Sequence, residues 1–258
     1  MEYDTLRVTG EDGVGVIVLN RPEVMNAMNK QMRAELTHAL KDLGMSMRVL
    51  VLTGAGRAFC SGQDLGDGGN AAQIDLERTL REEYEPMLRA IYDAPVPVIA
   101  AVNGSAAGAG ANLALAADVV IAAQTASFIQ AFARIGLMPD AGGTYFLPRQ
   151  VGFARAMGSM LFAEKIEAQQ AADWGMIWEA VADEAFEATW RARAASLAKG
   201  PTIAYRNIRK AVRKSLSNTL DAQLALEAQL QAEAGKTRDF QEGVLAFLEK
   251  RPASFEGR

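Results

Sequence analysis

The segment between Asp93 and Asp118 contains no charged residue, and it constrains the fold more than any other part of the chain. It reads APVPVIAAVNGSAAGAGANLALAA, which is long enough to cross a bilayer. Two prolines and an Asn-Gly pair interrupt it, however, and Asn-Gly is typical of a tight turn. We therefore interpret the segment as a buried strand, a turn and a buried helix inside a protein core, and not as a membrane span.

Strand and helix patterns alternate along the first part of the chain. LRVTG and VGVIVLN predict two strands joined by a Glu-Asp-Gly turn, and RVLVLTG, PVIAAV, VVIAA and SFIQ predict further short strands. KQMRAELTHALKDLG predicts an amphipathic helix that Asn29 or a neighbour caps and that ends at Gly44. A long polar helix is expected over about 74–92, and only helices from Asp183 onward. This order predicts an α/β core over 1–195 and a helical region over 196–258.

Composition excludes several classes of protein. A chain of 258 residues with 50% hydrophobic and 22% charged residues is not disordered, and its net charge of −4 argues against a nucleic-acid partner. The single cysteine, Cys60, precludes an intramolecular disulfide, and no basic-then-apolar leader is visible, so we expect a cytoplasmic protein without a membrane partner. One cysteine and one histidine, His38, cannot form a Cys/His metal cluster. We interpret Cys60 as a packing residue and His38 as a surface residue.

Two segments place small residues directly after a strand, namely RAFCSGQDL after RVLVLTG and NGSAAGAGAN after PVIAAV. Neither is a nucleotide-binding loop, because Leu113 replaces the third glycine of a dinucleotide fingerprint and no P-loop sequence occurs. The second segment leads into a helix, whose first N–H groups are free donors. If the two loops face each other, their amides would form an oxyanion hole. Alternatively, the small residues only permit tight packing of strand and helix.

These segments resemble those of the crotonase (enoyl-CoA hydratase/isomerase) superfamily, and the resemblance covers nearly the whole chain. The segments that carry it are NRPEVMNAMN, LTGAGRAFCSGQDL, PVIAAVNGSAAGAGANLALAAD, RIGLMPDAGGTYFLPR, AADWGMIWEAV and EGVLAFLEKR. The resemblance implies a spiral of ββα units and a C-terminal helical region that trimerises, giving a homotrimer or a dimer of trimers. It also implies an acyl-CoA substrate and no cofactor besides the coenzyme A of that substrate.

The resemblance also implies roles for individual residues. The backbone N–H groups of Gln63 and Ala109 would stabilise a thioester enolate. Asp64 could be a second acid, but its place in CSGQDL favours a role in holding the loop through hydrogen bonds. The residues implied to line the acyl and CoA channel, the last two of them in a neighbouring subunit, are Gly62, Asp64, Leu65, Gly108, Gly110, Phe132, Phe247 and Lys250.

The residues available as acid or base differ from those of the hydratases. Hydratases of the family use two glutamates, and this chain has Asn112 and Phe132 at those positions. Neither side chain can transfer a proton at neutral pH, so water addition is not expected. The remaining carboxylate, Asp140, matches the catalytic aspartate of dienoyl-CoA isomerases, and apolar neighbours would raise its pKa. The alternative is that Asp140 caps the helix that follows it.

Within the superfamily, AAGAGANLAL, GLMPDAGGT and WGMIWE are similar to the branch of ring-1,2-epoxyphenylacetyl-CoA isomerases of aerobic phenylacetate degradation. This similarity implies conversion of the epoxide to an oxepin-CoA and a double-bond shift in a dehydroadipyl-CoA. Phe128, Phe132 and Tyr145 either shape the acyl pocket or belong to the core. Two other functions stay open, a hydratase, hydrolase or lyase of the same fold and a non-catalytic oligomeric binding subunit.

Overall fold

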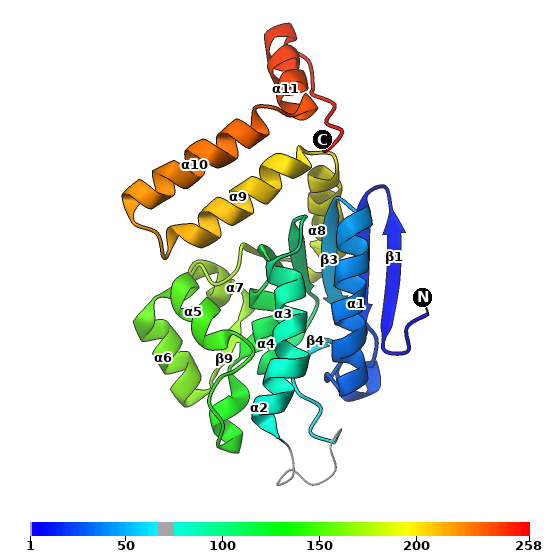
Figure 1. The fold of residues 1–258 in the computed structure, drawn as a ribbon. Helices are drawn as coiled ribbons and strands as arrows, with labels where there is room; N and C mark the ends of the chain where they lie inside the picture. The colour runs from blue at the N-terminus through cyan, green and yellow to red at the C-terminus, as the bar shows by residue number, and fades with distance from the viewer. Residues whose placement is uncertain (1, 67–74) are drawn as a thin grey trace.

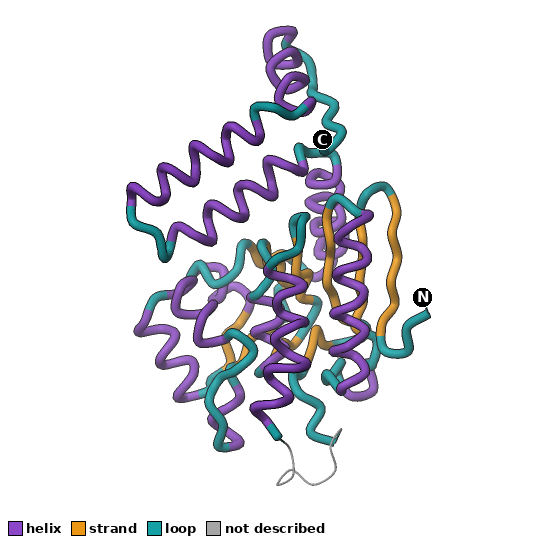
Figure 2. Tube along the Cα trace, in the orientation of Figure 1, coloured by secondary structure: helices purple, strands orange, loops and turns teal. Residues whose placement is uncertain are grey.

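The computed structural model describes residues 2–66 and 75–258, and its core contains a six-stranded sheet (Figures 1 and 2). The order of strands across this sheet is β1-β2-β3-β5-β7-β10. Only β1 and β2 are antiparallel, and the other neighbours are parallel. The strands are β1 (Leu6–Glu11), β2 (Val14–Leu19), β3 (Val49–Gly54), β5 (Val98–Val102), β7 (Val119–Ala123) and β10 (Glu179–Val181). Strands β3 and β5 are almost wholly buried, which explains their continuous apolar sequences.

A second sheet of four short strands lies beside the first, in the order β4-β6-β8-β9. Its strands are β4 (Ala58–Cys60), β6 (Ser105–Ala107), β8 (Ser127–Ile129) and β9 (Lys165–Glu167). Along the chain, β3, β5 and β7 are each followed by a strand of the second sheet and then by helices, so the predicted spiral of ββα units is confirmed. Because β4 and β6 are parallel neighbours, the segments that follow them begin at the same edge of this sheet.

Helix α1 (Lys30–Ser46) packs on the first sheet as its sequence pattern predicts. The side chain of Asn29 caps it by accepting a hydrogen bond of 2.8 Å from the N–H of Met32. The helix extends two residues beyond Gly44, where it was predicted to end. Its predicted apolar face is buried and consists of Met32, Leu36, Ala39, Leu40 and Leu43.

The predicted polar helix before β5 is formed by α2 (Leu76–Thr79), the π-helical turn η3 (Leu80–Tyr84) and α3 (Glu85–Tyr92). Its expected start at Ile74 lies outside the described residues. The uncharged segment of the sequence forms β5, β6 and α4 (Ala109–Leu115), as predicted. Among the residues that the structure describes, no helix is long and apolar enough to cross a membrane.

Short helices follow β7 and β8, namely the 3₁₀ turn η4 (Ala131–Ile135), α5 (Gly143–Val151), α6 (Phe153–Phe162) and α7 (Ala168–Asp173). Another 3₁₀ turn, η1 (Pro22–Val24), follows β2. The sequence pattern did not reveal β4, β6, β9 or β10 as separate strands. Each has only three residues, too few to show a period, and its pairing is set by distant segments.

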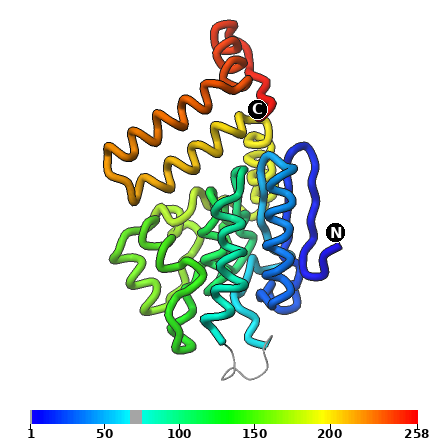
Figure 3. The backbone as a smooth tube through the Cα atoms, viewed as in Figure 1, coloured from blue at the N-terminus to red at the C-terminus, as the bar shows by residue number. Residues whose placement is uncertain are grey.

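The C-terminal helices project beyond the sheets (Figures 1 and 3). Helix α8 (Asp183–Ala198) packs on the first sheet, whereas α9 (Thr202–Ser215) pairs with α10 (Leu220–Ala234), and α11 (Arg238–Glu249) lies farthest away (Figure 1). Asp118 anchors α9 to the core by accepting hydrogen bonds from Arg209 at 2.6 Å and Arg213 at 2.7 Å. The predicted division between residues 195 and 196 falls inside α8 and stays a prediction.

Candidate active site

The two small-residue loops are in direct backbone contact. Gly62 has a φ of +98°, and a Cβ atom built on it would lie 2.9 Å from the carbonyl oxygen of Ala107 and 3.4 Å from the nitrogen of Ala109. A Cβ atom on Gly110 would lie 2.2 Å from the carbonyl oxygen of Cys60. The small residues therefore permit close packing and also bring the two loops together, as an oxyanion hole shared between them would require.

The amides predicted to form an oxyanion hole have local geometry that suits the role. Ala109 is the first residue of α4, so its N–H has no acceptor within the helix. Around Gln63, Met28 donates to the carbonyl of Gly62 at 2.8 Å and accepts from the N–H of Asp64 at 3.1 Å. These two hydrogen bonds form a parallel β-bridge between Met28 and Gln63, and the N–H of Gln63 takes no part in them. The shared hole remains a prediction, which these contacts support.

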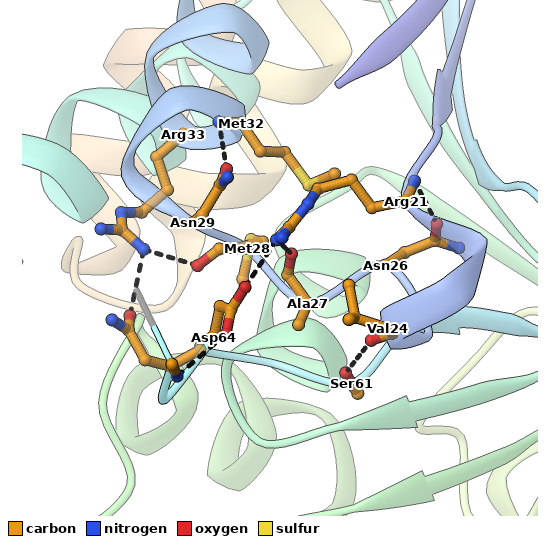
Figure 4. Close-up of polar contacts among 12 residues, drawn as sticks. Arg21, Val24, Asn26, Ala27, Met28, Asn29, Met32, Arg33, Ser61 and Asp64 are labelled. Carbon is orange, nitrogen blue, oxygen red and sulfur yellow. Dashed lines mark hydrogen bonds and ion pairs between the residues drawn. The ribbon is translucent and has the colours of Figure 1, made fainter. Parts of the chain in front are cut away.

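Asp64 holds the first loop in place, as one of the two sequence interpretations predicts. Its Oδ2 accepts a hydrogen bond of 2.7 Å from Arg21, and its Oδ1 accepts one of 3.0 Å from the N–H of Gly66 (Figure 4). The hydrogen bond from Arg21 is the largest cause that lowers the pKa of Asp64. The carboxylate therefore stays ionised and is committed to the loop.

Two residues that the sequence analysis missed, Arg33 and Tyr84, hold the side chain of Gln63. Its Oε1 accepts hydrogen bonds of 2.5 Å from the Tyr84 hydroxyl and 3.2 Å from Arg33. Arg33 also donates to the carbonyl of Met28 at 2.6 Å (Figure 4), and its side chain is only 3% exposed. An arginine on the apolar face of α1 was the feature that could have revealed this contact, because arginine is rarely buried without a partner.

Asp140 lies in the wall of a cavity of about 790 Å³. Residues of α2, η3 and α3 form one wall, the segment 137–146 forms another, and the end of α9 also contributes. The Oδ1 atom of Asp140 is buried and has no hydrogen-bond partner among the described residues. Burial raises the pKa of Asp140 to about 6, and a rise was predicted from the apolar neighbours of this residue in the sequence.

Tyr84 links the first loop to the cavity that Asp140 lines. Its side chain lines that cavity, and its hydroxyl is bonded to the Oε1 of Gln63. Burial is the largest cause that raises the pKa of Tyr84, and the negative charge of Asp140 is a smaller one.

The second loop is connected to Asp140 through Asn112 of α4. The Asn112 carboxamide donates a hydrogen bond of 2.8 Å to the backbone carbonyl of Asp140. Asp140 does not cap α5, because the cap position is Gly142 and no side chain bonds to the free amides there. The alternative role for Asp140 as a helix cap is therefore wrong.

The aromatic residues divide between the core and the cavity. Phe128 is fully buried in the core, and Phe132 is 7% exposed and lies beneath Gly108. Neither lines the cavity described above, whereas Tyr145 does, together with Tyr92 and Phe146 of the described chain. A contact of Phe132 with the substrate stays a prediction.

The remaining predicted residues do not line this cavity, and they include Gln63 and Ala109 with their neighbours in the two loops. Leu65 is exposed in the first loop. Phe247 lies on α11 and Lys250 caps the end of that helix, far from the helices that line the cavity (Figure 1). A contact of these two residues with the coenzyme A of a neighbouring copy stays a prediction. Cys60 is buried and its pKa is raised to about 12, so it cannot be a nucleophile, and His38 is exposed and bonded to Tyr3.

A ββα spiral with two glycine-rich loops in backbone contact and a cavity that contains a half-buried carboxylate is the architecture of the crotonase-fold enzymes. Residues 9–258 match the family model described as enoyl-CoA hydratase/isomerase, and the chain belongs to this family.

Three relatives show how far the similarity extends. A Rhodobacter capsulatus protein named "probable enoyl-CoA hydratase" is 66% identical, and the match covers 100% of both chains. The 1,2-epoxyphenylacetyl-CoA isomerase of Escherichia coli is 47% identical over 96% of this chain and 97% of that protein. The crystal structure of an enoyl-CoA hydratase from Bacillus anthracis superimposes with a TM-score of 0.91 at 32% identity, over 99% of this chain and 100% of that one. The relatives therefore include both hydratases and an isomerase.

Proposed function

We propose that this chain is an isomerase that moves a proton within an acyl-CoA thioester, with Asp140 as the acid and base. One observation carries the proposal. Asp140 is a half-buried carboxylate in the cavity wall whose backbone is bonded to Asn112 of the second loop, whereas the two positions that hydratases fill with glutamates are used otherwise. Asn112 is bonded to Asp140 and Gln130, and Phe132 is buried.

The proposed reaction is balanced without water. The Asp140 carboxylate removes a proton from a carbon conjugated with the thioester carbonyl, and the electron pair moves onto the carbonyl oxygen. The N–H groups of Gln63 and Ala109 stabilise this oxygen, and losing one such donor typically costs about 3 kcal/mol. The protonated Asp140 then returns the proton to another carbon, and the double bond is displaced. With a ring 1,2-epoxide as substrate, the bond between the two epoxide carbons also opens and its electron pair enters the new double bonds of the seven-membered oxepin, so no atom is gained or lost.

The pKa of Asp140 suits this role. A value of about 6 leaves the group ionised at neutral pH, so it can accept a proton. It is also a stronger base than an ordinary aspartate, whose pKa is about 3.9. A general base works best when its pKa is close to the working pH.

The cavity wall supports an acyl group that contains a ring. Tyr92, Tyr145 and Phe146 form an aromatic cluster with ring centroids 5.4 to 6.4 Å apart, and all three line the cavity. Aromatic faces and edges favour flat, apolar ligands. With the 47% identity to the Escherichia coli isomerase, this cluster supports ring-1,2-epoxyphenylacetyl-CoA as substrate and oxepin-CoA as product, with a related shift in dehydroadipyl-CoA.

Hydration is the second candidate, because the Rhodobacter capsulatus relative carries a hydratase name. Two further carboxylates, Glu85 and Asp93, line the cavity and could orient a water molecule. Both are exposed to solvent, whereas Asp140 is half-buried. The site therefore favours isomerisation.

Incubation in ¹⁸O-labelled water separates the two reactions. With crotonyl-CoA and with a 3-enoyl-CoA, we expect double-bond migration in the 3-enoyl substrate and no ¹⁸O in any acyl product, because a proton shift adds no oxygen. Mass spectrometry of the acyl-CoA products measures both. Incorporation of ¹⁸O at a rate comparable to migration would instead establish a hydratase.

A further inference from the structure

Asn112 and Gln130 form a buried chain of hydrogen bonds that ends on the backbone of Asp140. Gln130 donates to the Oδ1 of Asn112 at 2.8 Å, and the Nδ2 of Asn112 donates to the carbonyl of Asp140 at 2.8 Å. Gln130 is 1% exposed and Asn112 is 0% exposed. We propose that Asn112, supported by Gln130, is a positioning residue that fixes the Asp140 loop so that the carboxylate faces the cavity. This inference rests on the proposed function of Asp140.

The loop after Asp140 needs support from outside. Ala141 and Gly142 both adopt left-handed backbone conformations, with φ of 47° and 78°. Alanine disfavours this region, so the loop sequence alone does not select the observed conformation. The N–H of Gly143 also bonds to the Asp140 carbonyl, but that contact lies within the loop. Asn112 supplies the hydrogen bond from another element.

The two hydrogen bonds require a carboxamide at position 112. It donates and accepts at the same time, which an ionised carboxylate cannot do. Gly143 leaves room for this carboxamide, because a Cβ atom on residue 143 would lie 2.4 Å from the Nδ2 of Asn112. The helix position that the hydratases use for a glutamate would thus hold the base of the isomerase in place.

Asn112→Leu and Gln130→Met test the proposal, with Asn207→Leu as a matched control. Asn207 is 7% exposed and donates a hydrogen bond of 3.0 Å to the carbonyl of Leu230, so its replacement removes the same kind of contact between α9 and α10. Gln130→Met also removes Oε1, a buried atom without a partner among the described residues. The Gln130 variant is therefore expected to fold even if Asn112→Leu does not.

The pH dependence of kcat/KM distinguishes positioning from a general loss of stability. In the wild type, kcat/KM should fall as the pH drops through about 6, because protonated Asp140 cannot accept a proton. In Asn112→Leu and Gln130→Met the carboxylate is held less firmly and gains contact with water. The pH at which kcat/KM falls should therefore move toward the ordinary aspartate pKa of about 4. The other charged or titratable groups on the facing elements stay unchanged, namely Arg81, Tyr84, Glu85, Arg89, Tyr92, Asp93, Tyr145, Arg213 and Lys214.

We expect Asn112→Leu to lower kcat by about 100-fold, the typical cost of misplacing a catalytic group by 1 Å, while KM changes little. Gln130→Met should have a smaller effect in the same direction, and Asn207→Leu should keep both kcat and the pH limb. The inference is overturned if Asp140→Asn is inactive but both site variants behave like Asn207→Leu. Full activity of Asp140→Asn would instead remove the proposed function on which the inference rests.

Discussion

Replacing Asp140 by asparagine should lower isomerase turnover by about 1,000-fold while the protein keeps its fold and its affinity for acyl-CoA. Asparagine retains the shape of the side chain but cannot carry the proton, and general acid–base groups contribute on the order of 100- to 10,000-fold. Steady-state kinetics with a 3-enoyl-CoA and binding of a saturated acyl-CoA measure the two effects. Asp221→Asn, in an exposed position on α10, is the control and should be indistinguishable from the wild type. Near-normal turnover in Asp140→Asn would contradict the assignment.

The same substitution should stabilise the protein at high pH. The pKa of Asp140 is raised from 3.8 to about 6 in the folded state, so the folded chain binds more protons than the unfolded chain between these values. This carboxyl group therefore does not lower the free energy of unfolding below the lower pH value, and it lowers that free energy as the pH rises through the higher value. Because Asp140 is partly in contact with solvent, we expect a loss of only about 1–2 kcal/mol, which asparagine avoids.

Urea unfolding at pH 4 and pH 8 checks this expectation. The free energy of unfolding of Asp140→Asn minus that of the wild type should be larger at pH 8 than at pH 4 by that amount. An identical difference at both pH values would show that the carboxylate is not destabilised by burial. A gain in stability with a loss of turnover is the combination expected when a fold sustains a strained functional group.

Gly62→Ala should abolish most activity by separating the two loops. The new methyl group would lie 2.9 Å from the Ala107 carbonyl oxygen, which is closer than real Cβ atoms approach, and 3.4 Å from the Ala109 nitrogen. The loops must then move apart, and we expect turnover to fall by at least about 100-fold, the usual effect of losing an oxyanion donor. A left-handed φ of +98° adds strain for alanine and lowers stability further.

Gly152→Ala is the matched control for Gly62→Ala. Gly152 also has a left-handed φ, +79°, but nothing lies within 4 Å of the position of a Cβ atom. It should therefore show the cost of backbone strain in its thermal unfolding and none of the loss in turnover. If the two variants lost the same activity, the contact between the loops would have no part in catalysis.

The sequence was sufficient to predict the elements whose own residues determine them. Strands β3 and β5 are apolar along their whole length, and α1 has an apolar face and an asparagine cap, so local pattern defines them. The strands β4, β6, β9 and β10 were missed because strands of three residues exist only through pairing with segments elsewhere in the chain. The π-helical turn that places Tyr84 toward Gln63 has no recognised sequence pattern either.

The residues of the site also divide into those that the local sequence predicts and those that only the folded chain reveals. The glycine-rich loops and Asp140 occur in recognisable segments, and the raised pKa of Asp140 followed from its apolar neighbours. Arg33, Tyr84 and Gln130 were missed because their partners are distant in sequence, so only the folded chain shows what they contact. Asn112 was noticed only as the absence of a glutamate, and its contact with Asp140 required the structure.

Hydrogen exchange at the carbon next to the thioester tests the central claim most directly. Phenylacetyl-CoA has exchangeable hydrogens at that carbon and no double bond to move, so in deuterium oxide its mass reports formation of an enolate alone. We predict that the wild-type protein introduces deuterium into phenylacetyl-CoA and that Asp140→Asn and Gly62→Ala do not. An unchanged mass with the wild-type protein, or undiminished exchange with Asp140→Asn, would contradict the account.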